Sequence, residues 1–241
     1  MKIFAHRGSS TIWPENTLLA FNNADKAGAT GFETDLRLSK DGQIVLSHDD
    51  TLTRLGHPDK SVSKLTVEEI SRIEIASPDR LGRDTMIPLE MLLRAYPGKD
   101  YIFDCKTSEK ALFEKLSQLL STLQFHDRIW FLTWSPTADA YVRTLFPGCH
   151  YFPRMNRTYL WGWASVLKMG RWFEPRNRIL SLPAYHFNLP VFSKRQVASI
   201  QRRNKTFVGY LVNSEKAVER CRACGVEILL TDRPDLIAKD G

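Results

Sequence analysis

The feature that most limits the folds open to this chain is a repeated alternation of short apolar segments with segments of helical periodicity. The apolar segments have the length of strands and end in Gly, Pro or polar residues. Eight such strands are predicted, at Lys2–Gly8, Gly31–Leu38, Asp100–Lys106, Arg128–Trp134, Cys149–Arg154, Arg178–Tyr185, Thr206–Asn213 and Glu227–Asp232. This alternation favours an α/β fold, the (β/α)8 TIM barrel, and 241 residues suit one such domain over residues 1–241.

One connection is too short for the alternation. Only five residues follow the second strand before the next apolar run, whereas a parallel crossover needs about a dozen. Asp41-Gly42 is a turn signal, so Gln43–His48 should return antiparallel to the second strand. The following segment, at about residues 50–86, departs from the alternation and is predicted to be a small insertion. Thr66 is expected to cap a short helix within it.

Polar side chains gather where the predicted strands end, which is where a TIM barrel carries its catalytic groups. Glu33 and Asp35 share one face of the second strand because side chains alternate along a strand, and Asp104 and Lys106 share a face of the third. The hairpin return should bring His48 close to this group. The residues at strand ends are His6, Glu33, Asp35, Asp104, Lys106, Trp134, Tyr185, Asn213 and Asp232.

Several short motifs have the order and spacing of a known family. Those near the N-terminus are His6-Arg7-Gly8, Glu15-Asn16-Thr17, Glu33-x-Asp35, Asp41-Gly42 and His48-Asp49. With these motifs the chain resembles the glycerophosphodiester phosphodiesterases. Weaker matches extend the resemblance over nearly the whole chain, at Ile87–Glu90, Asp104-x-Lys106, Val212-Asn213 and Thr231–Pro234.

The resemblance implies a TIM-barrel hydrolase that cleaves glycerophosphodiesters to glycerol 3-phosphate and an alcohol, in lipid or glycerol metabolism. It also implies that the insertion lies above the barrel and shapes the substrate entrance. The implied site has two catalytic residues, four substrate-binding residues and three ligands of a divalent metal ion, Ca²⁺ or Mg²⁺. In that order they are His6 and His48; Arg7, Lys106, Trp134 and Asn213; Glu33, Asp35 and Asp104.

These residue types suit phosphodiester cleavage. A phosphodiester is an anion, so a catalyst must neutralise its charge, position a nucleophile and protonate the leaving alkoxide. Three carboxylates form an all-oxygen site for a hard cation, and Arg7 and Lys106 can donate to phosphate oxygens. His6 and His48 can exchange protons near neutral pH, so one can serve as base and the other as acid. The sequence leaves open which is which.

The chain departs from the family pattern at two places. Asp104 stands where the family has glutamate, so its carboxylate is one methylene closer to its own strand. The segment Tyr210–Asn213 replaces a usual Trp-Thr-Val-Asn, which changes the wall of the site. Metal choice and pocket shape are therefore open, whereas the acid, the base and the phosphate donors are retained.

Charge and composition limit the partners. Lys and Arg exceed Asp and Glu by 34 − 27 = 7, which is compatible with an anionic partner or with a generally basic surface. Without a nucleic-acid motif we expect no nucleic acid, but a small phosphodiester or an anionic membrane. The early first strand and the lack of a long apolar run predict a cytoplasmic protein. Cys221-x-x-Cys224 lacks a second pair, so we expect structural thiols. The oligomeric state is left open.

The segment Thr158–Phe173 is rich in Trp and other apolar residues, interleaved with Lys168 and Arg171. One interpretation is a peripheral membrane or lysophospholipid contact, because Trp beside cations suits a lipid interface. The other, which we favour, is a helix that packs on the barrel. Besides glycerophosphodiester hydrolysis, two activities are left open: phospholipase-D-like hydrolysis of lysophospholipids, and mere binding of phosphate esters by a catalytically degenerate barrel.

Overall fold

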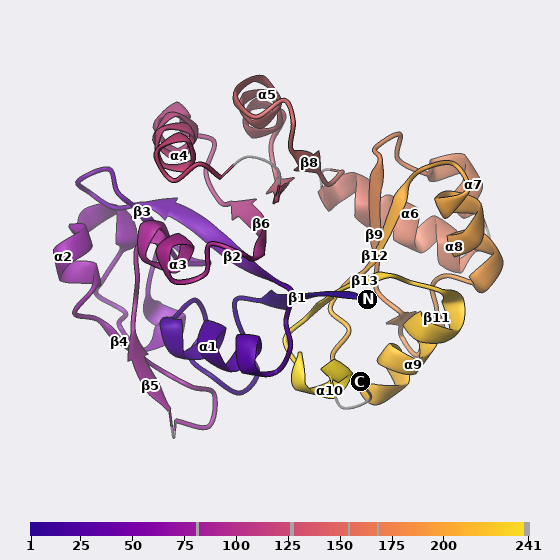
Figure 1. Cartoon of the computed structure of the whole chain (residues 1–241), viewed down its shortest axis with the longest axis horizontal. Helices are drawn as coiled ribbons and strands as arrows, with labels where there is room; N and C mark the ends of the chain where they lie inside the picture. The colour runs from indigo at the N-terminus through magenta and orange to yellow at the C-terminus, as the bar shows by residue number, and fades with distance from the viewer. Residues whose placement is uncertain (81, 126–127, 154, 168, 239–241) are drawn as a thin grey trace.

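A computed structural model describes residues 1–80, 82–125, 128–153, 155–167 and 169–238 of the chain. Eight parallel strands form a nearly closed TIM barrel, in the order β8-β7-β6-β2-β1-β13-β12-β9 (Figure 1). Their bounds are β1 Lys2–His6, β2 Gly31–Leu38, β6 Asp100–Cys105, β7 Ile129–Thr133, β8 His150–Tyr151, β9 Ile179–Leu182, β12 Thr206–Gly209 and β13 Ile228–Thr231. All eight lie within the predicted segments, so the predicted fold is confirmed.

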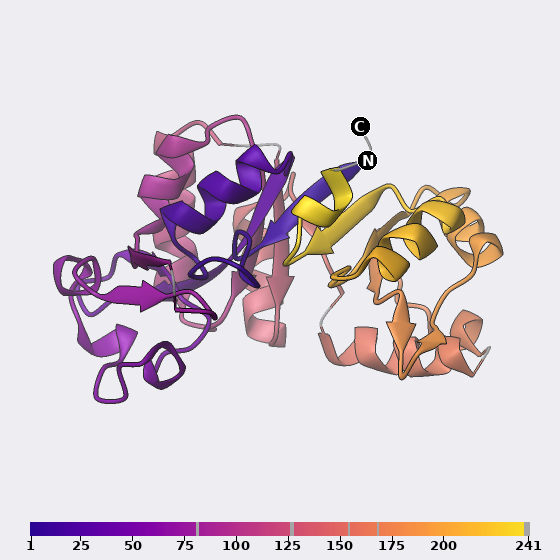
Figure 2. The same cartoon turned by 90° about the horizontal axis from the view of Figure 1, so that it is seen from below.

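Helices lie outside the strands in both views (Figures 1 and 2). Their bounds are α1 Leu18–Lys26, α3 Leu89–Ala95, α4 Lys110–Thr122, α5 Pro136–Leu145, α6 Met155–Val166, α7 Gly170–Phe173, α8 Lys194–Gln201, α9 Glu215–Cys224 and α10 Asp235–Ala238. Four of them begin after a Ser or Thr whose side chain accepts from a first-turn N–H, which satisfies a donor that the helix itself leaves free. These caps are Thr17, Ser135, Ser193 and Ser214. None of the described helices has the length and apolar character needed to cross a bilayer.

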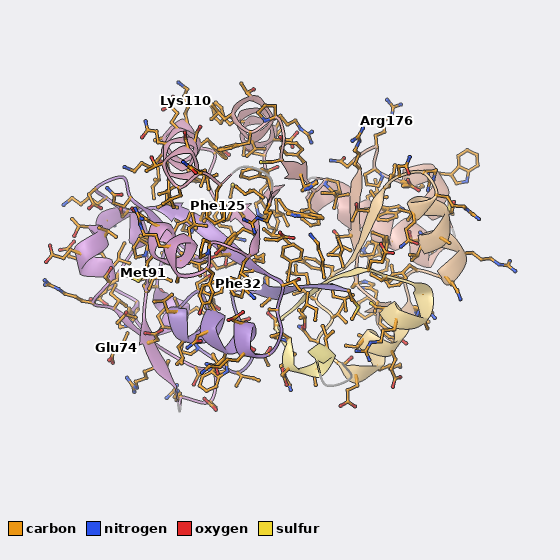
Figure 3. All side chains as sticks on the ribbon, viewed as in Figure 1. Phe32, Glu74, Met91, Lys110, Phe125 and Arg176 are labelled. Atoms are coloured by element: carbon orange, nitrogen blue, oxygen red, sulfur yellow. The ribbon has the colours of Figure 1, made fainter. Side chains whose placement is uncertain are left out.

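The core has layers because side chains alternate along each strand. One cluster of buried residues from six of the barrel strands includes Phe4 and Trp130, whose rings pack edge to face 5.6 Å apart. Between the sheet and the helices lie larger clusters, which contain Phe32 and Phe125, whereas Lys110 and Arg176 lie on the outside (Figure 3). The first and last strands, β1 and β13, are paired in parallel, so residues far apart in sequence meet at the middle of the sheet.

The predicted hairpin return is present. Strand β3 (Ile44–Leu46) pairs antiparallel with β2, with Leu36 opposite Leu46. The insertion that follows contains η1 (Thr53–Leu55), η2 (Val62–Lys64), α2 (Val67–Ile70), β4 (Glu74–Ala76) and β5 (Arg83–Thr85). Thr66 caps α2 in a capping box, as expected. The β4–β5 ladder was not predicted, because three-residue strands carry too little alternation to recognise.

The insertion has its own small core. Seven buried residues form it: Val45, Leu52, Val62, Ile70, Ile73, Ile75 and Met86. Since Val45 belongs to β3, the hairpin ties this core to the barrel. The insertion lies at the edge of the molecule (Figure 1), and η1, its first element, begins four residues after Asp49.

The predicted strand Arg178–Tyr185 ends early. Strand β9 stops at Leu182, because Pro183 has no N–H to continue the ladder. The chain continues into a short hairpin of β10 (Tyr185–His186) and β11 (Leu189–Pro190). This hairpin therefore projects from the end of the barrel at which the parallel strands finish. Arg154, at the end of the predicted fifth strand, lies outside the described residues.

Candidate active site and family

The tight turn after β1 places the first site residues. Arg7 and Gly8 both have positive φ, of 51° and 84°. A Cβ on Gly8 would lie 2.6 Å from the Cβ of Ala20 in α1, so only glycine allows the turn to pack this closely on the helix. The Arg7 backbone N–H then donates to the Glu33 carbonyl at 3.0 Å and contacts its side chain at 3.1 Å. The ends of β1 and β2 are thereby joined.

The three predicted metal ligands meet in the structure. Glu33, Asp35 and Asp104 are all buried, and one oxygen from each lies within 4.8 Å of the others. Asp35 and Asp104 are register partners on the neighbouring strands β2 and β6, and Glu33 precedes Asp35 by one two-residue period. The three carboxylates therefore share one face of the sheet, as the alternation of side chains predicts.

Two cations compensate these carboxylates in part. Arg7 Nε lies 3.0 Å from Asp35 Oδ2, and Lys106 Nζ lies 3.1 Å from Asp35 Oδ1 and 2.5 Å from Asp104 Oδ2. Burial alone would raise the pKa of Asp35, but the charges of Arg7 and Lys106 outweigh it and hold the pKa below its usual range. Burial raises the pKa of Glu33 to about 8; the charge of His6 opposes this rise, and repulsion from Asp35 and Asp104 adds to it. Arg7 and Lys106 therefore compensate the repulsion among the three carboxylates only in part.

The donor set fits a hard divalent cation. All candidate ligand atoms are carboxylate oxygens, the type that Ca²⁺ and Mg²⁺ prefer. Asp35 Oδ1 is buried and accepts no hydrogen bond from any described residue, although Lys106 stands near it. Burial also raises the pKa of Asp104, although the charge of Lys106 opposes the rise. A divalent ion here would give the free oxygen a partner and offset the mutual repulsion.

His6 is held between two carboxylates. Its Nδ1 lies 2.5 Å from Asp232 Oδ1, and its Nε2 lies 3.7 Å from Glu33 Oε2. Burial would lower the pKa of His6, but the charges of Glu33 and Asp232 outweigh it and the pKa is raised. Asp232 also accepts a hydrogen bond from Ser10 Oγ at 2.7 Å. This carboxylate thus orients the imidazole so that Nε2 is directed toward the acidic group.

Asp232 was expected at a strand end, but without a role in the site. The signal was the weaker motif Thr231–Pro234, which begins at the last residue of β13. Asn16 was likewise expected only as part of the motif Glu15-Asn16-Thr17. In the structure it is buried, its Nδ2 donates to Asp35 Oδ2 at 2.9 Å, and its Oδ1 accepts from Thr34 Oγ1 at 2.8 Å. The contacts of Asp232 and Asn16 cannot be inferred from sequence spacing, because each joins residues of different elements.

His48 stands beside β2, as the hairpin argument predicted. Ser47 N donates to the Asp35 carbonyl at 3.1 Å, and the His48 carbonyl accepts two hydrogen bonds from Arg37, at 2.8 and 3.1 Å. The imidazole Nδ1 lies 2.8 Å from Asp49 Oδ1. His48 is more exposed than His6, so it stands nearer the solvent side of the site.

The structure also places the remaining predicted substrate residues. Trp134 is half exposed, its Nε1 donates to Asp104 Oδ1 at 2.7 Å, and Lys106 Nζ lies 5.1 Å from its ring centroid. Asn213 is farther round the barrel, and its amide group hydrogen-bonds Asp232. Trp134 therefore borders the acidic group, whereas Asn213 is linked to His6 through Asp232.

Comparisons with known proteins agree with this arrangement. A family model described as the glycerophosphoryl diester phosphodiesterase family matches residues 6–236. Over 250 residues the chain is 27% identical to a glycerophosphodiester phosphodiesterase of Bacillus altitudinis, covering 99% of this chain and 97% of that protein. The family resemblance found in the sequence is confirmed.

Solved structures share the fold. A glycerophosphoryl diester phosphodiesterase domain from Mycobacterium tuberculosis matches with a TM-score of 0.81 at 19% identity, covering 99% of this chain and 98% of that one. An Oleispira antarctica phosphodiesterase in complex with the product sn-glycerol-3-phosphate matches with a TM-score of 0.76 at 22% identity, covering 100% and 97%. Since the family model also spans nearly the whole chain, this protein belongs to the glycerophosphoryl diester phosphodiesterase family of enzymes, which hydrolyse glycerophosphodiesters.

Proposed function

We propose that this protein is a metal-dependent glycerophosphodiester phosphodiesterase that releases glycerol 3-phosphate and an alcohol by histidine acid and base catalysis. The observation that carries the proposal is the group Glu33, Asp35 and Asp104, buried beside two cations and His6 at the carboxyl ends of the strands. Family membership and the product bound to the Oleispira antarctica protein support the same substrate class. A cytoplasmic location and a single domain over residues 1–241 stay predictions from the sequence.

Each task of the reaction has a candidate residue. A divalent cation held by the three carboxylates would neutralise phosphate charge and lower the pKa of a bound water. Arg7 and Lys106 lie beside that group, where their N–H donors can also reach non-bridging phosphate oxygens. His6, directed by Asp232, and His48, held by Asp49, are the proton carriers. We propose Trp134 and Asn213 as walls of the substrate site.

A second candidate is hydrolysis of lysophospholipids at the same site. A cavity of about 280 Å³ opens where β9 and β12 end, and its lining is mostly apolar: Gly162, Trp163, Ser181, Leu182, Pro183, Tyr185, His186, Val191, Tyr210 and Leu211. Because these parallel strands end on the same side as β1 and β2, the cavity lies on the catalytic side of the barrel. An acyl chain is a ligand that such a lining favours.

In the segment Thr158–Phe173, some residues support the interpretation as core and others the interpretation as a lipid contact. Trp161 is fully buried and packs on Phe207, as the favoured core interpretation predicted. Trp163 and Trp172 are 49% and 82% exposed, and Trp163 also lines the apolar cavity. Lys168 and the side chain of Arg171 lie outside the described residues. We therefore propose Trp163 and Trp172, without Trp161, as the lipid-contacting residues.

The first prediction concerns the metal ion. Treatment with EDTA should abolish choline release from glycerophosphocholine, and added Mg²⁺ or Ca²⁺ should restore it. Asp35→Asn removes the negative charge and replaces a carboxylate oxygen with a neutral amide group, so calorimetry should show metal affinity lowered by at least ~10-fold. Asp59→Asn, on the exposed surface, is the matched control. Full turnover in EDTA would refute the metal requirement.

The second prediction concerns the two histidines. General acid and base catalysis is worth about 10²–10⁴ in rate, so His6→Gln and His48→Gln should each lower kcat by that order while circular dichroism shows that the fold is retained. His150→Gln is the control, because His150 pairs with Trp130 near the start of β7, at the opposite end of the barrel. If either site variant turns over like the wild type, that histidine is not a catalyst.

The third prediction concerns Asp232 and pH. Burial would raise its pKa, but hydrogen bonds from His6, Ser10 and Asn213 lower it to about 2. Because the unfolded value is about 3.9, the carboxylate stabilises the fold above about pH 4, and this contribution is lost as pH falls through about 2. Asp232→Asn should therefore lower the free energy of unfolding by about 2 kcal/mol at about pH 5, and the difference should shrink toward pH 2.

Urea unfolding across this range measures the Asp232 effect. His6 is protonated throughout the range, since its pKa is raised, so only the aspartate titrates within the pair. Asp59→Asn should change stability little at any of these pH values. A constant difference between wild type and Asp232→Asn over the whole range would show that the loss comes from packing instead of charge.

The fourth prediction separates the two substrate classes. Trp163→Ala combined with Trp172→Ala should reduce choline release from lysophosphatidylcholine in vesicles several-fold while sparing soluble glycerophosphocholine. Trp161→Ala, which empties a core site, should instead lower the melting temperature and reduce both activities equally. Equal losses on both substrates in the double variant would exclude a lipid-specific role for the segment.

A further inference from the structure

Arg54 connects parts of the site that come from different segments of the chain. It lies in η1, the first element of the insertion, and its side chain spans two carboxylates. Nε donates to Asp49 Oδ2 at 2.8 Å, while Nη1 and Nη2 donate to the two oxygens of Glu15 at 2.8 and 2.7 Å. Glu15 belongs to the loop before α1, and Asp49 directly follows the hairpin return. One guanidinium group therefore joins the insertion, the first loop and the hairpin.

Each of the two carboxylates also contacts a residue that we propose to take part in the reaction. Asp49 uses its other oxygen, Oδ1, to contact His48 Nδ1 at 2.8 Å. Glu15 lies 3.4 Å from Arg7 Nη1, and Arg7 Nε in turn lies 3.0 Å from Asp35. The path of hydrogen bonds and ion pairs from His48 to the acidic group thus passes through Arg54.

We propose that Arg54 is a positioning residue for the reaction, which holds Asp49 and Glu15 so that the His48 ring and the Arg7 guanidinium take their working orientations together. This inference rests on the proposed function of His48 and Arg7. It assigns the insertion a part in catalysis: one of its side chains completes the support of the site.

The geometry distinguishes Arg54 from an ordinary surface ion pair. Exposed single pairs contribute little, and the Arg54 side chain is 47% exposed. Yet its fork meets Glu15 with two bonds, and Glu15 is 13% exposed, so the planar group has a defined orientation. A lysine cannot replace Arg54 here, because its ammonium group has no planar set of donors in fixed directions and cannot bridge the two carboxylates in this way.

Asp49 shows the consequence at His48. Partial burial would raise the pKa of Asp49, but hydrogen bonds from His48 and Arg54 outweigh it and lower the pKa. The carboxylate is therefore ionised, and it favours the proton on His48 Nδ1, which leaves Nε2 free for proton transfer. Without Arg54, Asp49 loses the bond that fixes its second oxygen, and the imidazole loses a rigid partner.

The test compares Arg54→Gln, Arg54→Lys, Asp49→Asn and the double variant Arg54→Gln/Asp49→Asn on glycerophosphocholine. Arg54→Gln should lower kcat by ~10–100-fold, the usual effect of removing an orienting partner, with a smaller change in KM. Arg54→Lys should recover only part of kcat. The double variant should be no worse than the poorer single variant, because both changes break the same path to His48. Arg72→Gln is the control, because Arg72 is an exposed residue of the same insertion that pairs with Glu68.

A second readout does not depend on activity. The ¹⁵N signals of the His48 imidazole should report a shift in tautomer balance in Arg54→Gln and none in Arg72→Gln. If the wild-type enzyme fails to hydrolyse glycerophosphodiesters, the proposed function is wrong, and these signals still decide whether Arg54 orients His48. Wild-type kcat with an unchanged tautomer in Arg54→Gln would overturn the inference. It would also be overturned if the losses of kcat in the two single variants added up in the double variant and each matched a fall in melting temperature.

Discussion

The site depends on the repulsion among three carboxylates that the barrel buries at one end. Strand register brings one carboxylate oxygen each of Glu33, Asp35 and Asp104 within 4.8 Å of one another. Neighbouring cations offset part of the resulting repulsion. Arg7 and Lys106 hold the pKa of Asp35 low, while Glu33 retains a raised pKa of about 8. Because repulsion among the carboxylates remains, the group is suited to bind a divalent cation.

Around this group, each of the two histidines that we propose as proton carriers is held by a carboxylate: His6 by a distant residue and His48 by its neighbour in the chain. Asp232, at the end of the last strand, holds His6 at the end of the first, because β13 and β1 are neighbours. Asp49 holds His48 in the same manner, and Arg54 fixes Asp49. Two histidines thus receive matched carboxylate partners from separate loops. The insertion is part of this support, although its own core is small and lies apart from the barrel core.

The end of the barrel at which the parallel strands finish combines a charged half with an apolar half. The acidic group and its cations lie at the ends of β1, β2 and β6, whereas the apolar cavity lies at the ends of β9 and β12. Under our proposal, a phosphodiester with an acyl chain would contact both halves, and a soluble glycerophosphodiester only the charged half. Asp104 accepts hydrogen bonds from Lys106 and Trp134, the residues that directly follow β6 and β7, so its side chain is held at the acidic group from both strands.

The sequence by itself determined the barrel, the hairpin and the shared face of Glu33 and Asp35, because these follow from local periodicity and turn chemistry. It also indicated His6 and His48 through motif spacing. It did not determine the β4–β5 ladder or the early end of β9, where short strands and Pro183 override the pattern. Only the tertiary structure decided that Asp232 orients His6, that Arg54 bridges Glu15 and Asp49, and that Trp161 is buried while Trp163 is exposed. These are contacts between distant segments, and local patterns carry no information on which distant side chains will meet.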